Sequence, residues 1–92
     1  MSVYTSRPSV GTSAALLGPH QAAHNAMGNS CSVAIYNPGP TTVVIGNASV
    51  TTSLGLSLVS GSTLQADLTD TEALYGVVAS GTQTVHVLES GV

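Results

Sequence analysis

Residues 31–92 read CSVAIYNPGPTTVVIGNASVTTSLGLSLVSGSTLQADLTDTEALYGVVASGTQTVHVLESGV, and this stretch decides the fold. Short runs rich in Val, Ile, Leu and Thr are separated by turn-forming residues such as Asn37–Pro40, Gly46-Asn47 and Ser60-Gly61. Apolar residues recur at every second position within several runs, as in strands with one buried face. About seven short strands at this spacing predict an all-β domain, a small antiparallel β-sandwich or barrel.

The residues before this stretch follow a different pattern. Residues 1–8 are polar and include proline, so we expect an extended N-terminal arm that orders when docked. Residues 10–17 could form one strand, and residues 20–27 (HQAAHNAM) have helix formers for at most two turns. The chain therefore divides into residues 1–30, an arm with a first strand and loop, and residues 31–92, a β-sandwich domain.

Alternation within the sandwich predicts which side chains are buried. Leu64, Ala66 and Leu68 alternate with polar residues that include Asp67, so we expect Asp67 on the wet face. Gly76 interrupts a run that is apolar on both faces, which predicts a close neighbour there. The last strand is expected to end before a polar tail that starts at Glu89.

Charge is scarce and excludes several functions. Only 5% of the 92 residues are charged, the net charge is −3, and Arg7 is the single cation. A basic surface for nucleic acid or for anionic membranes is therefore absent from the sequence. We expect no secretory signal, because residues 1–8 are polar and interrupted by proline. Cys31 has no partner for an internal disulfide and is expected to be a small buried side chain.

Histidines and hydroxyls give no recognisable catalytic motif. The sequence has no Gly-x-Ser-x-Gly elbow to support a serine nucleophile. His20 and His24 are spaced for one helical face, and His86 or Cys31 are only distant additional ligands, whereas a zinc site needs three or four. We therefore interpret these histidines as loop and interface residues.

Carboxylates cluster only in the segment DLTDTE. Asp67, Asp70 and Glu72 could serve as calcium ligands or as a glycosidase pair, but they lack the spacing of an EF-hand. Turn capping by Asp70 is the simpler interpretation. We therefore predict no enzyme activity, no cofactor and no bound metal.

Two segments resemble a known group of proteins. YNPGPTTVVIGNASVTT (residues 36–52) and LQADLTDTEALYGVVASGTQTVHVLE (residues 64–89) resemble small β-sandwich virion proteins of tailed bacteriophages, which attach to capsids or other virion parts. The resemblance covers about residues 31–88 and implies no catalytic residue.

The resemblance implies a structural role in a phage particle. We expect a non-enzymatic capsid decoration or accessory protein that is made in the host cytoplasm and binds and stabilises the assembled head shell at the capsid surface. Its partners would be the major capsid protein or another virion structural protein, and further copies of itself, a trimer being one arrangement that suits a lattice site. The candidate contact residues are Tyr4, Arg7, Val10, His20, His24 and Met27.

Two alternatives remain open. The protein could be an accessory of the tail or neck. It could also be a carbohydrate-binding module for host attachment, with Tyr36 or Tyr75 beside Asp67 or Asp70; this requires an exposed aromatic ring.

Overall fold

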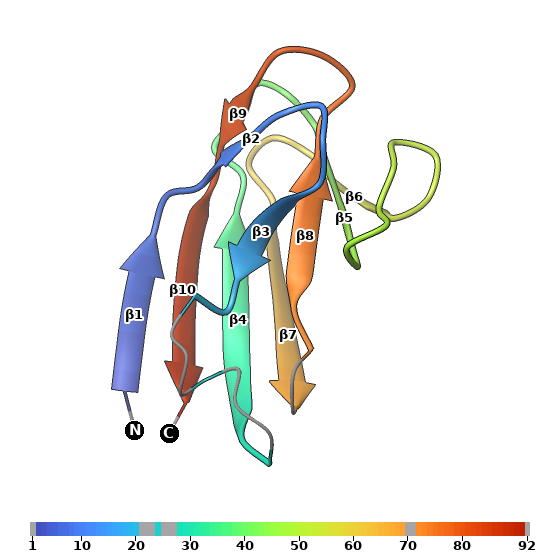
Figure 1. Ribbon diagram of the computed structural model, residues 1–92. Coiled ribbons are helices and arrows are strands. Elements are labelled where there is room, and N and C mark those ends of the chain that lie inside the picture. Colours follow the sequence, from blue (N-terminus) through green and yellow to red (C-terminus); the bar gives the residue numbers. More distant parts are fainter. Residues whose placement is uncertain (1, 21–23, 25–27, 70–71, 92) are drawn as a thin grey trace.

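The computed structural model describes residues 2–20, 24, 28–69 and 72–91 (Figure 1). These residues form ten β-strands and no helix, so no described segment has the long apolar helix needed to cross a membrane. The strands are β1 (Ser2–Ser6), β2 (Ser9–Val10), β3 (Ala15–Gly18), β4 (Ser30–Tyr36), β5 (Val43–Gly46), β6 (Leu56–Leu58), β7 (Thr63–Thr69), β8 (Leu74–Val77), β9 (Gln83–Thr84) and β10 (His86–Gly91). The expected all-β fold is confirmed.

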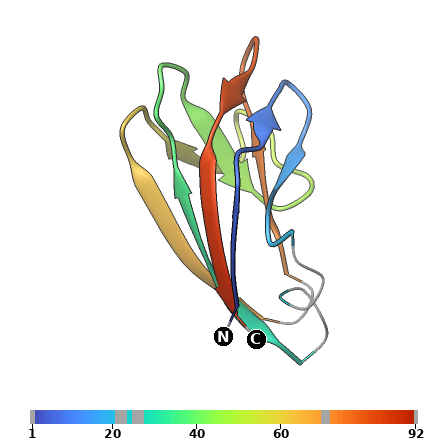
Figure 2. The ribbon, with the colours of Figure 1, turned by 90° about the vertical axis from the view of Figure 1, so that its left-hand side faces the viewer.

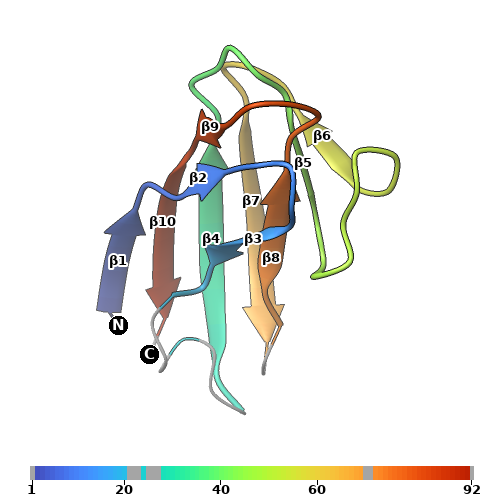
Figure 3. The ribbon, with the colours of Figure 1, turned by 45° about the horizontal axis from the view of Figure 1, so that its top comes forward.

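The strands form two packed four-stranded sheets. We call the sheet with the order β1-β10-β4-β7 the front sheet and the sheet with the order β3-β8-β5-β6 the back sheet; Figure 1 views the molecule from the side of the back sheet. Every ladder is antiparallel. Figure 3 shows β3 of the back sheet crossing in front of β4 of the front sheet. The chain passes repeatedly from one sheet to the other. The resulting strand order in the two four-stranded sheets is that of a jelly roll. The short β2–β9 pair lies in the connections β1 to β3 and β8 to β10.

The first residues differ from the expected arm. Ser2–Ser6 is strand β1, which pairs with β10 from Ser2 opposite Gly91 to Ser6 opposite Val87. Figure 2 shows β1 and β10 side by side along the edge of the front sheet. The exposed edge of β10 offers backbone groups that an extended polar segment satisfies by pairing. Most of the short helix expected over residues 20–27 lies outside the described residues.

Aliphatic side chains from both sheets fill the space between the layers. Leu17, Ile35 and Val43 are among the largest that are wholly buried. Gly76 is needed at the centre, because an added Cβ would lie 2.9 Å from Leu17 Cδ1 and 3.1 Å from Val43 Cγ1. The close neighbour expected at this glycine is confirmed. Leu68 is buried and Asp67 exposed, as the alternation predicts.

A smaller apolar cluster lies on the outer face of the back sheet. It contains Val44, Val50 and Val77, with Tyr75 packed against it. Val44 and Val77 are directly opposite each other on β5 and β8. Val50 comes from the connection between β5 and β6 and packs close to Gly46. The back sheet is thus covered on both faces, which explains the apolar sequence of β8.

Four connections meet at what we call the upper end of the sandwich (Figure 1). Asn37 is wholly buried there, and its Nδ2 donates to the carbonyl oxygens of Thr41 and Leu58, both at 2.8 Å. Its Oδ1 accepts the N–H of Gly39 at 2.9 Å. Gln83 Oε1 accepts the N–H of Thr41 at 3.0 Å. Two neutral amides therefore close this end.

Candidate functional site

The outer face of the front sheet is a surface that the described strands leave uncovered. Strand alternation directs one row of side chains outwards at Tyr36, with His86 opposite it on β10 and Thr63 opposite it on β7. Two residues along the strands, the next outward row contains Thr5, Leu88, Ala34 and Gln65. This face is rich in hydroxyl and small side chains.

Two hollows lie on this face. The upper hollow has a volume of about 630 Å³ and includes Arg7, Tyr36, Thr63 and His86 in its lining. The Tyr36 and His86 rings lie 5.8 Å apart and are tilted by 57°. Tyr36 is 40% exposed, so one aromatic surface is accessible from the hollow. The position of Tyr36 therefore satisfies the condition set for a carbohydrate site, whereas Tyr75 packs on the back sheet.

The lower hollow continues along the same strands and has a volume of about 640 Å³. Its lining is different: it is dominated by serines, by Thr69 and by the carboxylate of Asp67. Ser32 Oγ donates to Asp67 Oδ1 at 2.6 Å, which fixes the carboxylate on the sheet. Among the described residues of this face, Asp67 carries the negative charge, and it lies in the lower hollow, whereas Arg7 lies in the upper hollow.

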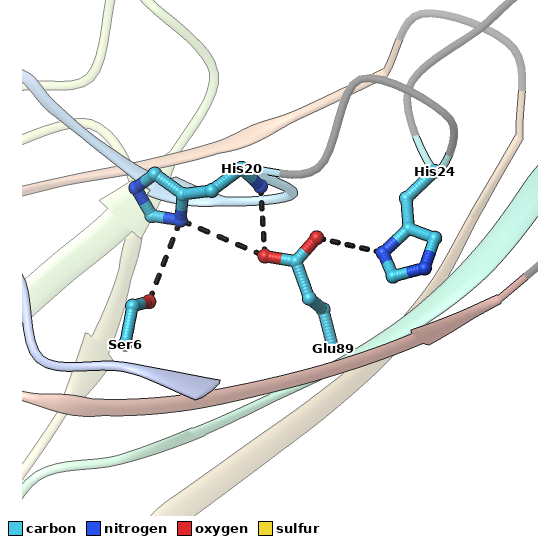
Figure 4. A network of polar contacts seen from close by, with 4 residues as sticks. All are labelled: Ser6, His20, His24 and Glu89. Atoms are coloured by element: carbon cyan, nitrogen blue, oxygen red, sulfur yellow. Dashed lines mark hydrogen bonds and ion pairs between the residues drawn. The ribbon is translucent and has the colours of Figure 1, made fainter. Parts of the chain in front are cut away.

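A separate polar network contains Ser6, His20, His24 and Glu89 (Figure 4). It lies at the lower end of the sandwich, the end at which Figure 1 draws both chain termini. Glu89 on β10 is wholly buried. Its Oε1 accepts the backbone N–H of His20 at 2.7 Å, and its Oε2 lies 2.8 Å from Nδ1 of the buried His24. Because an ionised carboxylate only accepts, the second contact is a hydrogen bond when His24 carries a proton on Nδ1. Glu89 therefore fixes the connection from β3 to β4 against the front sheet.

Ser6, His20 and Glu89 lie in sequence along one chain of contacts without forming a catalytic triad. Ser6 Oγ lies 3.4 Å from His20 Nδ1, and that same nitrogen lies 3.6 Å from Glu89 Oε1. A triad needs the serine and the carboxylate on opposite ring nitrogens, so that one can accept a proton while the other is held. Because Ser6 and Glu89 both face the Nδ1 atom of His20, the three residues do not have the geometry of a triad.

Metal binding has no support in the part of the chain that the structure describes. No three His, Cys, Asp or Glu side chains there are close enough to hold an ion. His20 and His24 meet at Glu89, while His86 lies in the upper hollow. Cys31 is buried, as expected; burial raises the pKa of its thiol, and the nearby carboxylates Glu89 and Asp67 raise it further.

Three exposed aliphatic side chains lie at the β6 edge of the back sheet. Leu54, Leu56 and Val59 are 67%, 59% and 52% exposed, respectively, on β6 and its flanking turns. We call these three residues the β6 patch. β6 pairs with β5 and has no second neighbour among the described strands, so its other side is open. The patch lies on the uncharged part of the chain, because residues 8–66 contain no Asp, Glu, Lys or Arg.

The candidate contact residues do not form one surface. Tyr4 is partly exposed and its ring lies 6.2 Å from that of His20, which is exposed. Arg7 is exposed and lies in the upper hollow. Val10 and His24 are buried, so their side chains are not available at the surface. Met27 lies outside the described residues.

Glu89 is the main residue that sequence reasoning missed. We expected a polar tail from Glu89, but β10 extends to Gly91 and places Glu89 inside. The alternation Val85, Val87, Glu89 was a usable signal, because it assigns Glu89 to the buried face. The sequence offers Tyr36 as a candidate for a carbohydrate site, but its presence in one hollow with Arg7 depends on the pairing of β1 with β10.

Comparisons of the chain with protein-family models, with curated proteins and with solved structures give no match.

Proposed function

We propose that the protein is a non-enzymatic structural protein of a phage virion, a decoration or accessory protein that binds the assembled head shell and stabilises it. One observation carries the proposal: the β6 patch exposes three large aliphatic side chains, and all three belong to a stretch of sequence without charged residues. Exposed aliphatic patches of this kind mark contacts with other proteins. The resemblance of residues 31–88 to phage virion proteins supports the class of partner.

Attachment would use both the side chains and the backbone of β6. The open side of this edge strand offers N–H and C=O groups to an extended segment of a shell subunit. Leu54, Leu56 and Val59 would be removed from water in the same contact. A protein that binds the assembled lattice and not its free subunits stabilises the lattice by mass action. No catalytic step is needed.

The test is co-sedimentation of the purified protein with expanded empty heads and, in parallel, with isolated tails. We expect a fixed number of copies on heads and none on tails. Leu56→Lys should weaken head binding by about tenfold or more, since a charge would be buried against the shell. Val3→Lys is the matched control, because Val3 is a similarly exposed aliphatic on β1 and lies away from the patch.

Recovery on tails alone would replace the head assignment by the tail or neck alternative. Equal binding of the Leu56→Lys and wild-type proteins would remove the β6 patch from the contact. Sedimentation of the protein without heads gives its oligomeric state, and circular dichroism confirms that both variants are folded.

A further inference from the structure

Arg7 is the single Lys or Arg of the sequence, and it lies in the upper hollow of the front sheet. It follows β1 directly and lies in the upper hollow, in line with the outward row formed by His86, Tyr36 and Thr63. The hollow thus combines the guanidinium with an accessible aromatic ring. Both features are on the outer face of the front sheet, away from the β6 patch on the back sheet.

No carboxylate among the described residues forms a salt bridge with Arg7. Asp67 shares the outer face but lies two outward rows away, about 13 Å along the strands. Glu89 points to the opposite side of the sheet, into the core, where it holds His20 and His24. The positive charge in the hollow is therefore available to a negatively charged group from outside the chain.

Tyr36 supplies a surface for a flat, partly apolar ligand. Tyr36 is 40% exposed, and the strand register sets His86 on one side of it and Thr63 on the other. The tilted contact with His86 limits how far the Tyr36 ring can turn. An aromatic face held in place beside polar groups suits the C–H face of a sugar ring.

The remaining lining favours a ligand with many hydroxyl groups. Thr5, Thr63, Tyr36 and His86 can all donate or accept hydrogen bonds, and Leu88 and Ala34 are the aliphatic side chains of the adjoining outward row. A protein contact would require a broader apolar centre than these two residues give. The volume of about 630 Å³ is within the usual range for small-ligand sites.

We propose that the upper hollow binds an acidic sugar, whose ring stacks on Tyr36 and whose carboxylate pairs with Arg7. The planar guanidinium matches a carboxylate with two parallel hydrogen bonds. Thr63 and His86 would bind the sugar hydroxyls beside the ring. A longer glycan would continue along the strands into the lower hollow, towards Ser32 and Asp67. This activity is independent of the β6 patch and of attachment to a head shell.

Two probes differing in one group provide the test: methyl glucuronide, which has a carboxylate, and methyl glucoside, which has a hydroxymethyl group in its place. Binding is followed by shifts of backbone amide signals in nuclear magnetic resonance titrations. We expect the glucuronide to bind in the millimolar range, about tenfold more tightly than the glucoside, with shifts centred on Tyr36 and His86.

Three variants assign the roles. Arg7→Gln should remove the preference and bring the two sugars to within about twofold of each other. Tyr36→Ala should weaken both sugars by about tenfold or more. Tyr4→Ala is the control, because Tyr4 is a partly exposed tyrosine outside the hollow and should leave both affinities unchanged.

Several results would overturn the proposal. These are the absence of shifts with the glucuronide and with a methyl sialoside, equal binding by Arg7→Gln, or a preference for an acetylated peptide with a free carboxylate over both acidic sugars. Dissociation of a dimer by Tyr36→Ala, without sugar binding by the wild type, would instead make this face an interface between copies of the chain. Thermal unfolding of each variant checks that it is folded.

Discussion

The upper and lower ends of the sandwich are closed by different chemistry. At the upper end, the neutral amides of Asn37 and Gln83 hold the turns, with Gly39 and Thr41 as near neighbours in sequence. At the lower end, one buried carboxylate holds a connection whose anchored residues are 65 and 69 positions away in the chain. Two of the four upper contacts, those of Asn37 with Gly39 and Thr41, form within one turn, whereas both lower hydrogen bonds join segments that are far apart in the chain.

The comparison shows how a nearly uncharged protein uses one of its few charges. A buried carboxylate costs far more to remove from water than a buried amide, so it must be well provided with hydrogen bonds. Among the described residues, Glu89 is the buried ionisable carboxylate, and its contacts with His20 and His24 attach the connection between β3 and β4 to β10. Loss of this group should therefore affect the lower end more than loss of any single amide affects the upper end.

The largest effect is expected from Glu89→Gln. The amide keeps the size of the side chain but replaces one acceptor oxygen by a donor, so either His20 N–H or His24 loses its acceptor. We expect a loss of about 3 kcal/mol in the free energy of unfolding, measured by urea denaturation. Asp67→Asn, at an exposed carboxylate, is the matched control and should change stability by less than about 0.5 kcal/mol. A small effect of Glu89→Gln would mean that the lower end does not depend on the charge.

At the upper end, Asn37→Ala should lower the free energy of unfolding, measured by urea denaturation, by about 2 kcal/mol. The reason is that the carbonyl groups of Thr41 and Leu58 lose their hydrogen-bond donor in a buried site. Asn47→Ala provides the control. Asn47 caps an exposed turn through the N–H of Ser49, and its loss should cost well under about 1 kcal/mol. If both substitutions lower the free energy of unfolding equally, the burial of Asn37 does not increase the contribution of its hydrogen bonds to stability.

The two histidines allow a sharper test of the lower end. His24→Ala removes a buried side chain bound to the carboxylate, and we expect a loss of about 1.5 kcal/mol. His20→Ala leaves the backbone N–H that binds Glu89, so its loss should be below about 0.5 kcal/mol. The reverse order in urea denaturation would show that the His20 ring, and not the N–H, is the important contact.

The smallest effect concerns pH. Burial raises the pKa of the Cys31 thiol in the folded state, so the unfolded thiol ionises first as the pH rises. The contribution of Cys31 to stability is therefore present below about pH 8.5 and decreases above that value. Cys31→Ala should show a shallower decline of unfolding free energy at alkaline pH than the wild type. Parallel curves for the two proteins would contradict the raised pKa.

The strands and turns of residues 31–92 were predictable because local chemistry specifies them. Asn37–Pro40 ends β4, and the alternation around Leu64, Ala66 and Leu68 assigns the faces of β7 correctly. Gly76 is needed by close packing, which its neighbours in sequence already indicated. Each of these features depends on residues that are near one another in the chain.

The remaining features were not predictable because they depend on pairing between distant segments. Residues 2–6 have no apolar alternation, and they become β1 because β10 offers an edge. The upper hollow forms where Arg7, Tyr36 and His86 come together from three separate parts of the chain. The depth of Glu89 follows from the extension of β10 beyond Leu88. Sequence periodicity could identify the faces of strands, but not which strands are neighbours.

The pairing of β1 with β10 places the two ends of the chain close together, so the protein is suited to circular permutation. Ser2 lies directly opposite Gly91, and both chain ends lie at the same corner of the sandwich (Figure 2). A short linker between these ends could close the backbone into a ring, which could then be opened in the exposed turn around Thr52 and Ser53. The resulting circular permutant would keep every strand pair and would move the free ends from the front sheet to a position beside the β6 patch.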